Sequence, residues 1–306
     1  MPIEATSKIW MDGEYVDWDA ARVHVLTPSL HYGWGAFEGI RAYETVSGNS
    51  AVFRLTDHMK RLFRSAKIYH MEPPISLEGS VKVVKDLVAM NGVRTCYIRP
   101  IVYLGYGEIG LNPLVSTVRM AIACWPWGAY LGEDAFETGV RVKMSSWRRL
   151  DPNIIPPAAK ATGQYLNSSL AKAEAIKAGY DEGVLLNPNG YVTDGSGENL
   201  FIVRDGALCT PPLAAGCLAG ITRDSIMRIA ADEGLDVHET DLVRTDLYLA
   251  DEAFFTGTAA EVVPIREVDD RVLGDPGPIT RRVQEVFVAA TRGRDERYTD
   301  WLELVE

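Results

Sequence analysis

Lys160 is the residue of this chain whose surroundings most suggest chemistry. It lies in PAAKATGQYLN (157–167), where small residues flank it and few charges are near. A lysine amine withdrawn from water has a lowered pKa and can form a Schiff base with a carbonyl compound. Most lysines lie on the surface, so the same pattern also fits an exposed helix residue. The segment by itself leaves both interpretations open.

An acidic, glycine-rich segment, DGSGENLF (194–201), follows an alternating apolar run. A lysine together with a carboxylate that keeps a pyridine nitrogen protonated is the pair that pyridoxal 5′-phosphate (PLP) requires. Asp194 and Glu198 are the acids of this segment that could supply that carboxylate. The pair makes PLP a candidate cofactor.

Two further segments could bind a phosphate. Residues 218–224, LAGITRD, open an amphipathic helix whose first N–H groups could hold an anion, although a plain helix start is commoner. Arg61 and Arg64 lie on a helix that follows Thr56; each is either a solvated arginine, which is the commoner case, or a phosphate ligand. These segments are therefore compatible with a phosphorylated cofactor and do not establish one.

An aromatic, glycine-rich segment, SLHYGWGAFEGIRAYE (29–44), fits two interpretations. It could be a strand that enters through a glycine bend, which the pattern slightly favours. It could also supply a wall of aromatic side chains, Tyr32, Trp34 and Phe37, around a small-molecule site.

The bulk composition limits the class of protein. The chain has 306 residues and a formal net charge of −11, which argues against nucleic acid and against an anionic membrane surface as partners. The length favours two domains, which we place at 1–125 and 135–306 with a linker at 126–134, where Pro126 and two glycines interrupt the pattern. The four cysteines form no CxxC and no metal-binding spacing appears, so we expect reduced thiols, no metal and a cytoplasmic location. We find no signal peptide and no apolar run long enough to span a bilayer.

The order of the elements predicts the fold class. Hairpins are expected at Asp12-Gly13, Asn187–Gly190 and Asp205-Gly206, and a short strand at 22–27. A helix is expected to follow Lys160 and to run to about Gly179, with Leu166, Leu170, Ala173 and Ile176 along one side. Hairpins dominate and no regular βαβ alternation appears, which favours an α+β protein over a Rossmann-type sheet.

Eight segments, in order and over nearly the whole chain, resemble the branched-chain amino acid aminotransferases, which are fold-type IV PLP enzymes. They are HYGWGAFEGIRAY (31–43), YIRP (97–100), GLNP (110–113), PWGAYLG (126–132), PAAKATGQYLN (157–167), DGSGENLF (194–201), GITRD (220–224) and TGTAAEV (256–262). Each is modest alone, and the series is specific. The resemblance implies an α+β, two-domain fold, with a small N-terminal α/β domain and a larger C-terminal PLP-binding domain whose sheet is mainly antiparallel.

The resemblance also implies roles for individual residues. Lys160 would form the internal aldimine and act as catalytic base. The cofactor would be bound by Arg61, Tyr165, Asp194, Leu218, Ile221, Thr222 and Thr258. Among these, Asp194 would be the acid at the pyridine nitrogen, with Glu198 as a reserve candidate for which we favour a structural role. The substrate would be bound by Tyr32, Phe37, Gly39, Tyr97, Arg99, Trp127, Tyr130, Thr258 and Ala259, with Leu111 supplied by the neighbouring subunit of at least a homodimer. Within this set, Arg99 would meet the distal carboxylate of glutamate or 2-oxoglutarate.

The activity implied is a ping-pong transfer of the amino group from branched-chain L-amino acids to 2-oxoglutarate, which gives the 2-oxo acid and L-glutamate. Three positions depart from the family's usual pattern: Asp194 replaces a glutamate, Trp34 a small polar residue, and Leu111 a valine. The alternatives are a transaminase of R-selective amines or D-amino acids, aminodeoxychorismate lyase, which eliminates pyruvate without a 2-oxo acceptor, and a PLP-binding scaffold without turnover.

Overall fold

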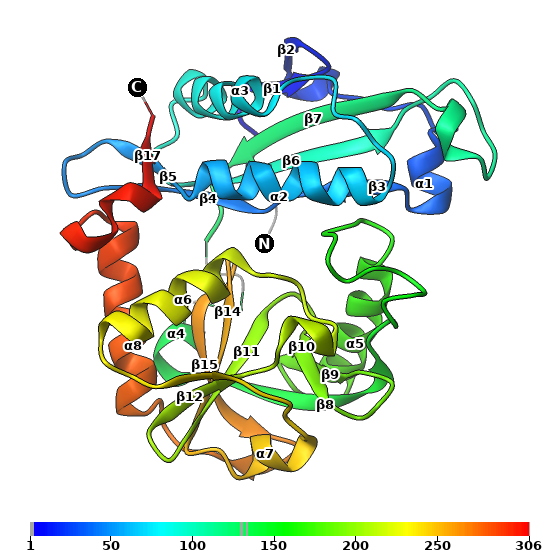
Figure 1. Ribbon diagram of the computed structural model, residues 1–306. Coiled ribbons are helices and arrows are strands. Elements are labelled where there is room, and N and C mark those ends of the chain that lie inside the picture. Colours follow the sequence, from blue (N-terminus) through cyan, green and yellow to red (C-terminus); the bar gives the residue numbers. More distant parts are fainter. Residues whose placement is uncertain (1–2, 129–130, 133, 306) are drawn as a thin grey trace. The chain divides into compact units, whose positions relative to one another are not determined.

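The computed structural model describes residues 3–128, 131–132 and 134–305, which form two compact units (Figure 1). The first unit comprises Met1–Trp127, Ala159–Gly163 and Ala289–Glu306, and the second Gly128–Ala158 and Gln164–Val288. The first division lies inside the expected linker, 126–134. The chain then returns twice to the first unit, at 159–163 and at 289–306, which the division at a single linker does not anticipate. Both returns are made by β-pairing with strands of the first unit.

The first unit is built on one antiparallel sheet, in the order β17-β5-β4-β6-β7-β1-β2, with β3 paired to β6. Its strands are β1 (Lys8–Met11), β2 (Glu14–Asp17), β3 (Gly35–Phe37), β4 (Ile40–Glu44), β5 (Ser50–Phe53), β6 (Cys96–Leu104), β7 (Val118–Trp125) and β17 (Leu302–Leu304). The expected hairpin at Asp12-Gly13 joins β1 to β2, and both turn residues have positive φ, 50° and 103°, as a type I′ turn requires.

The helices of this unit are α1 (Pro28–Tyr32), α2 (Leu55–Ile68) and α3 (Leu77–Met90), with short 3-10 turns at Trp18–Ala20, Pro113–Val115 and Glu296–Trp301. The apolar faces of α2 and α3 line one core. Met59 and Leu62 of α2 are buried there together with Ile98 and Val102 of β6. Successive strand residues point to opposite faces, so the residues of β6 that alternate with this core series point away from the helices.

The strand expected at 22–27 is wrong. Residues 21–27 form an irregular loop, in which Val23, Val25 and Leu26 are exposed. The alternation of apolar residues there has no neighbouring strand on which to pack.

The second unit holds a sheet in the order β10-β9-β8-β15-β14-β11-β12-β13, with β16 beside β15. Its strands are β8 (Val140–Arg148), β9 (Glu182–Leu186), β10 (Val192–Gly195), β11 (Asn199–Arg204), β12 (Ala207–Thr210), β13 (Val237–Glu239), β14 (Glu252–Gly257), β15 (Glu261–Val268) and β16 (Arg271–Val272). Most pairs are antiparallel; β8 runs parallel to both its neighbours, and β12 runs parallel to β13. The hairpins predicted at 187–190 and 205–206 join β9 to β10 and β11 to β12. The α+β class is thus confirmed.

The helices of the second unit are α4 (Ala135–Thr138), α5 (Tyr165–Lys177), α6 (Ile221–Asp232), α7 (Arg244–Tyr248) and most of α8 (Pro278–Thr291), with a 3-10 turn at Leu213–Ala215. Within the described ranges, no helix is both long and apolar enough to cross a membrane.

Helix α5 buries a different face from the one the sequence suggests. Its buried residues are Ser168, Ala171 and Ala175, whereas Leu166 and Ile176 are exposed. Small side chains allow the helix to lie close to β8 and β9, and this close approach decides which face is covered.

Candidate functional site

The main chain around Lys160 is fixed against β3 in the first unit. The backbone N–H of Phe37 donates to the Lys160 carbonyl at 3.0 Å, and the N–H of Thr162 donates to the Gly35 carbonyl at 2.9 Å. The Lys160 N–H donates to the Ser65 hydroxyl of α2 at 3.0 Å. Hydrogen bonds of both its backbone C=O and its backbone N–H therefore fix the position of this lysine.

The side chain of Lys160 is half-buried, and its Nζ lies 5.2 Å from the centre of the Phe37 ring. The guanidinium carbon of Arg99 lies 4.9 Å from the same ring and 5.2 Å from the Tyr97 ring. Trp127 packs edge-on against Tyr97, with ring centres 4.5 Å apart. The first unit thus brings two cations and three aromatic rings of the predicted set together.

Tyr97 and Arg99 share a strand face because they are two residues apart on β6. A Cβ placed on Gly39 would lie 1.9 Å from the Tyr97 hydroxyl, so this position has no room for a side chain. Arg99 Nη2 is 3.4 Å from that hydroxyl, and its buried Nε has no hydrogen-bond partner among the described residues. A buried donor without a partner fits a carboxylate ligand.

Arg61 is held by a buried glutamate that the sequence did not single out. Arg61 Nε and Nη2 donate to the two oxygens of Glu38 at 2.7 and 2.9 Å. His58 Nδ1 lies 2.8 Å from Glu38 Oε2, and since a carboxylate only accepts, Nδ1 carries the proton. Arg61 is therefore neither a solvated arginine nor isolated; it belongs to a buried network with Glu38 and His58.

The charges of this network follow from burial and pairing. Burial alone would raise the pKa of Glu38, but Arg61 and His58 bring that pKa well below its ordinary value. Burial lowers the pKa of His58, against the opposing effect of Glu38, with Arg61 and Lys160 adding to the lowering. The network therefore consists of a carboxylate, a guanidinium and a neutral imidazole near pH 7.

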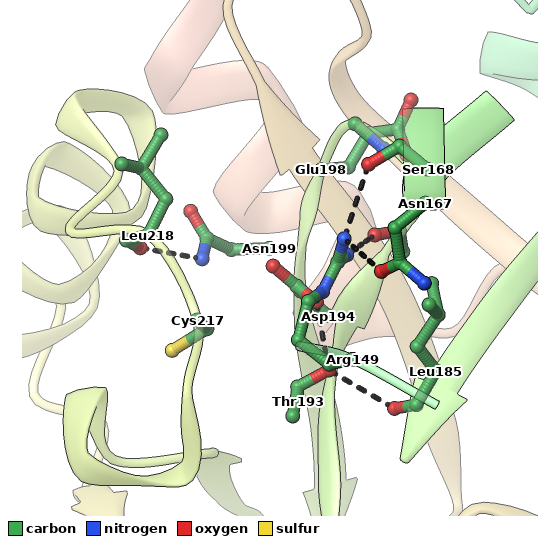
Figure 2. Close-up of polar contacts among 12 residues, drawn as sticks. Arg149, Asn167, Ser168, Leu185, Thr193, Asp194, Glu198, Asn199, Cys217 and Leu218 are labelled. Atoms are coloured by element: carbon green, nitrogen blue, oxygen red, sulfur yellow. Dashed lines mark hydrogen bonds and ion pairs between the residues drawn. The ribbon is translucent and has the colours of Figure 1, made fainter. Parts of the chain in front are cut away.

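In the second unit, Asp194 is buried near the end of β10 (Figure 2). Arg149 donates to its Oδ1 through Nε at 2.9 Å and Nη2 at 2.6 Å, and the Thr193 hydroxyl donates to the same oxygen at 2.7 Å. Burial raises the pKa of Asp194, while Arg149 and Thr193 oppose the rise, with a smaller contribution from the backbone of Leu218. The site thus contains a buried acid whose charge depends on its neighbours.

The start of α6 has the features of an anion site. Gly220 is the N-cap and, as a glycine, supplies no capping side chain. Asn199 Nδ2 donates to the Leu218 carbonyl at 2.9 Å, and a Cβ on Gly220 would lie 1.9 Å from the Asn199 amide oxygen. The loop before the helix is therefore fixed by a close approach that only glycine permits, and the first N–H groups, including that of the buried Thr222, carry the positive end of the helix dipole.

These residues fit a phosphorylated pyridine. A buried carboxylate with one oxygen unused by side-chain donors suits a protonated ring nitrogen, and an uncapped helix start suits a phosphate. Thr258 and Ala259, half-buried in the turn between β14 and β15, add a hydroxyl and backbone donors.

The remaining predicted residues have simpler surroundings. Tyr165 is half-buried as the first residue of α5. Tyr32 ends α1 and is 45% exposed, while Leu111 is 86% exposed in the loop between β6 and β7. Tyr130 lies outside the described residues.

Sequence reasoning did not single out five residues that hold the predicted ones: Glu38, His58, Ser65, Arg149 and Thr193. The first was visible as an acid inside an otherwise apolar strand region, FEGI, where a charge requires a partner. The partners of Glu38, which are His58 and Arg61, lie 20 and 23 residues further along the chain, so no local pattern identifies them.

The chain belongs to the family described as Amino-transferase class IV, whose model matches residues 35–268. It is 47% identical over 300 residues to the branched-chain-amino-acid aminotransferase of Pseudomonas aeruginosa, with 97% of each chain covered. The crystal structure of the Escherichia coli branched-chain amino acid aminotransferase matches with a TM-score of 0.96 and 45% identity, over 98% of this chain and 100% of that one. The branched-chain amino acid aminotransferase of Thermobaculum terrenum, in its PLP form, matches with a TM-score of 0.93 and 36% identity, over 99% of both chains.

Proposed function

We infer that the protein is a branched-chain amino acid aminotransferase that uses PLP to transfer the amino group of leucine, isoleucine or valine to 2-oxoglutarate. Full-length similarity to relatives of that name supports the reaction. The placement of Arg99 carries the proposal for the acceptor, because this half-buried guanidinium lies over two aromatic rings and its buried Nε has no partner among the described residues. Such a pocket offers apolar surface to a branched chain and a bidentate partner to an acid.

We propose that Lys160 is the lysine that binds the cofactor and that Asp194 is the acid at its ring nitrogen. PLP, when bound, supplies a carbonyl carbon for amines and a ring that takes up the electrons left when the substrate α-carbon loses a proton. Lys160 Nζ would take that proton as general base and return it to the former carbonyl carbon of the cofactor, on the other side of the amino nitrogen. Asp194 Oδ2 holds the proton on the ring nitrogen, because a nearby negative charge raises the pKa of a pyridine.

The other predicted cofactor residues would hold the rest of that group. Tyr165 would donate to the phenolic oxygen. The phosphate would be held by Arg61, Thr258 and the α6 start, that is Leu218, Ile221 and Thr222. Two observations support these assignments: the N-cap of α6 is a glycine, and the hydrogen bond to Glu38 fixes the orientation of Arg61.

The substrate would be held at both ends. Tyr97 and the turn at Thr258-Ala259 would take the α-carboxylate. Phe37, Trp127, Tyr130 and Tyr32 would bury the side chain, and Gly39 would keep Tyr97 in place. Burial of a leucine side chain contributes about 1.5–3 kcal/mol, enough to favour it over alanine by at least about tenfold.

We further propose that the protein is at least a homodimer and acts in the cytoplasm. The loop that carries Leu111 also exposes Ile109, Leu114 and Val115, an apolar group that a second copy would cover. All four cysteines are free and buried, as in proteins of a reducing compartment.

Half-reactions of an Arg99→Ala variant test the acceptor assignment. Loss of the guanidinium should slow the reaction with 2-oxoglutarate by about 30-fold or more and the reaction with leucine much less, since only the former brings a second carboxylate. Stopped-flow spectra of the two half-reactions measure this, with Arg64→Ala, an exposed arginine of α2, as control. Equal losses in both half-reactions would remove the acid-binding role.

A further inference from the structure

Arg149 directly follows β8 and has a side chain only 11% exposed. Its guanidinium makes five hydrogen bonds (Figure 2). Nε and Nη2 donate to Asp194 Oδ1, and Nη2 also donates to the Gly195 carbonyl at 2.7 Å. Nη1 donates to Ser168 Oγ at 3.0 Å and Asn167 Oδ1 at 3.4 Å. The side chain is thus held by β10 on one side and by the first turns of α5 on the other.

The distribution of bonds over the two oxygens of Asp194 is uneven. Every side-chain hydrogen bond that the described residues make to this carboxylate ends on Oδ1, two from Arg149 and one from Thr193. An arginine that served only as a counter-charge would more often bond both oxygens with its fork. This arrangement instead fixes the orientation of the carboxyl group and leaves Oδ2 for another donor.

Arg149 also supports the charge of that carboxyl group. Burial raises the pKa of Asp194, and the Arg149 guanidinium is the largest opposing influence. A buried carboxyl group that loses its paired cation takes up a proton, and a protonated acid cannot hold a positive charge on a ligand nitrogen.

We propose that Arg149 is a positioning residue for the cofactor: it holds Asp194 by Oδ1, so that Oδ2 is presented to the pyridine nitrogen, and it ties that acid to the helix that begins with Tyr165. The proposal rests on the function proposed above for Asp194. Arg149 itself touches neither cofactor nor substrate in this assignment; it acts through Asp194.

The test uses holoprotein reconstituted with ¹⁵N-labelled PLP, whose ring-nitrogen chemical shift reports protonation at that atom. Arg149→Met removes the donors at similar length, and Arg149→Lys keeps one charge without the fork. Arg148→Met is the matched control, because within the described ranges the Arg148 side chain donates to the carbonyls of Asn187 and Pro188 and to no carboxylate. Thermal unfolding of each variant is followed in parallel.

Arg149→Met should move the ring-nitrogen shift to the deprotonated range near pH 8, as Asp194→Asn does, and slow the leucine half-reaction by about tenfold or more. Arg149→Lys should lie between, and Arg148→Met should match the wild type. The double variant Asp194→Asn, Arg149→Met should have the same ring-nitrogen chemical shift as Asp194→Asn alone and a leucine half-reaction no slower. If Arg149→Met does not fold, Arg149→Lys decides by the same measurement.

The proposal would be overturned if the ring-nitrogen chemical shift of folded Arg149→Met protein equalled that of the wild type. If Arg149→Met does not fold, the same result in Arg149→Lys would overturn it. So would a further change of the shift in the double variant, because Arg149 would then act by another route. If Asp194→Asn itself leaves the shift unchanged, the assignment of Asp194 fails, and if wild-type protein does not bind PLP, the proposed function fails. The three failures are therefore distinguishable.

Discussion

Glu38 and Asp194 are both buried carboxylates beside an arginine, yet the pKa of the first is lowered and that of the second is raised. Glu38 has donors on both oxygens: Oε1 accepts from Arg61, and Oε2 accepts from Arg61, from His58 and from the Gly39 N–H at 3.2 Å. In Asp194 the side-chain donors all end on Oδ1, and the backbone of Leu218 adds a smaller stabilising contribution. Both groups lose water on burial, so the difference lies in how completely protein donors replace it.

The difference separates a structural ion pair from a functional one. A carboxylate with both oxygens satisfied is stable in its charged form and holds its neighbours in place, as Glu38 does for Arg61. A buried carboxylate with one oxygen that accepts from no side chain is costly to keep charged in the apoprotein. A cationic ligand group relieves that cost. The comparison therefore predicts unequal losses of stability when each charge is removed, with the larger loss at Glu38.

The largest effect is expected from Glu38→Gln. The change leaves Arg61 buried without its counter-charge, which should lower the free energy of unfolding of the apoprotein by about 3–5 kcal/mol. Urea unfolding at pH 7 measures it. Glu44→Gln is the matched control, because the Glu44–Arg94 pair is exposed and should contribute at most about 1 kcal/mol. Similar losses in the two variants would contradict a compensated buried network.

Asp194→Asn should cost less stability. The folded protein raises the pKa of Asp194, so a neutral side chain relieves part of the cost of burying that charge, although Arg149 loses its counter-charge; the apoprotein should therefore lose clearly less stability near pH 7 than Glu38→Gln does. Transamination should fall by about 100-fold or more, since the ring nitrogen loses its acid. Urea unfolding and leucine turnover check both. Asp86→Asn is the control, because the Asp86 side chain is 40% exposed and pairs with the exposed Lys82. Destabilisation as large as that of Glu38→Gln would erase the distinction.

A smaller, pH-dependent effect is expected at Glu198. Burial, with the nearby Glu182 charge, raises the pKa of Glu198 to about 8, above its value in the unfolded chain. A group with a raised folded pKa gives its full stabilisation below the unfolded pKa, about 4.3, and loses it as the pH rises through 8. Glu198→Gln should therefore gain on the wild type by about 1 kcal/mol or more between pH 5 and pH 8 in apoprotein unfolding.

The pH dependence of the unfolding free energy that we expect from Glu38 has the opposite sign. Its lowered pKa means that its stabilisation is present above the unfolded value and is lost as the pH falls below about 4.3. Glu38→Gln should thus change the acid side of the stability profile and Glu198→Gln the neutral to alkaline side. A Glu198→Gln difference that is constant with pH would show that this carboxyl group is not held neutral.

Local signals made part of the fold predictable. The hairpins at Asp12-Gly13 and Asp205-Gly206 follow from residues that accept positive φ between apolar runs, and all four have it. The strand at 22–27 and the buried face of α5 were wrong, because both depend on which surface lies opposite, and a residue pattern does not carry that information.

The candidate site divides in the same way. Lys160 and Asp194 stand in short, distinctive segments, so the sequence identifies them. The partners of Arg61 and Asp194, namely Glu38 and Arg149, come from other elements, and only the fold brings each pair together. Long-range ion pairs of this kind leave no local pattern.

Borohydride reduction of the holoprotein, followed by peptide mass mapping, shows directly which amine carries the cofactor. We expect the reduced pyridoxyl phosphate group on Lys160 and on no other lysine, and neither label nor transamination in Lys160→Ala. Label on another residue, such as Lys143 or Lys172, or full transamination by the Lys160→Ala protein, would contradict the account.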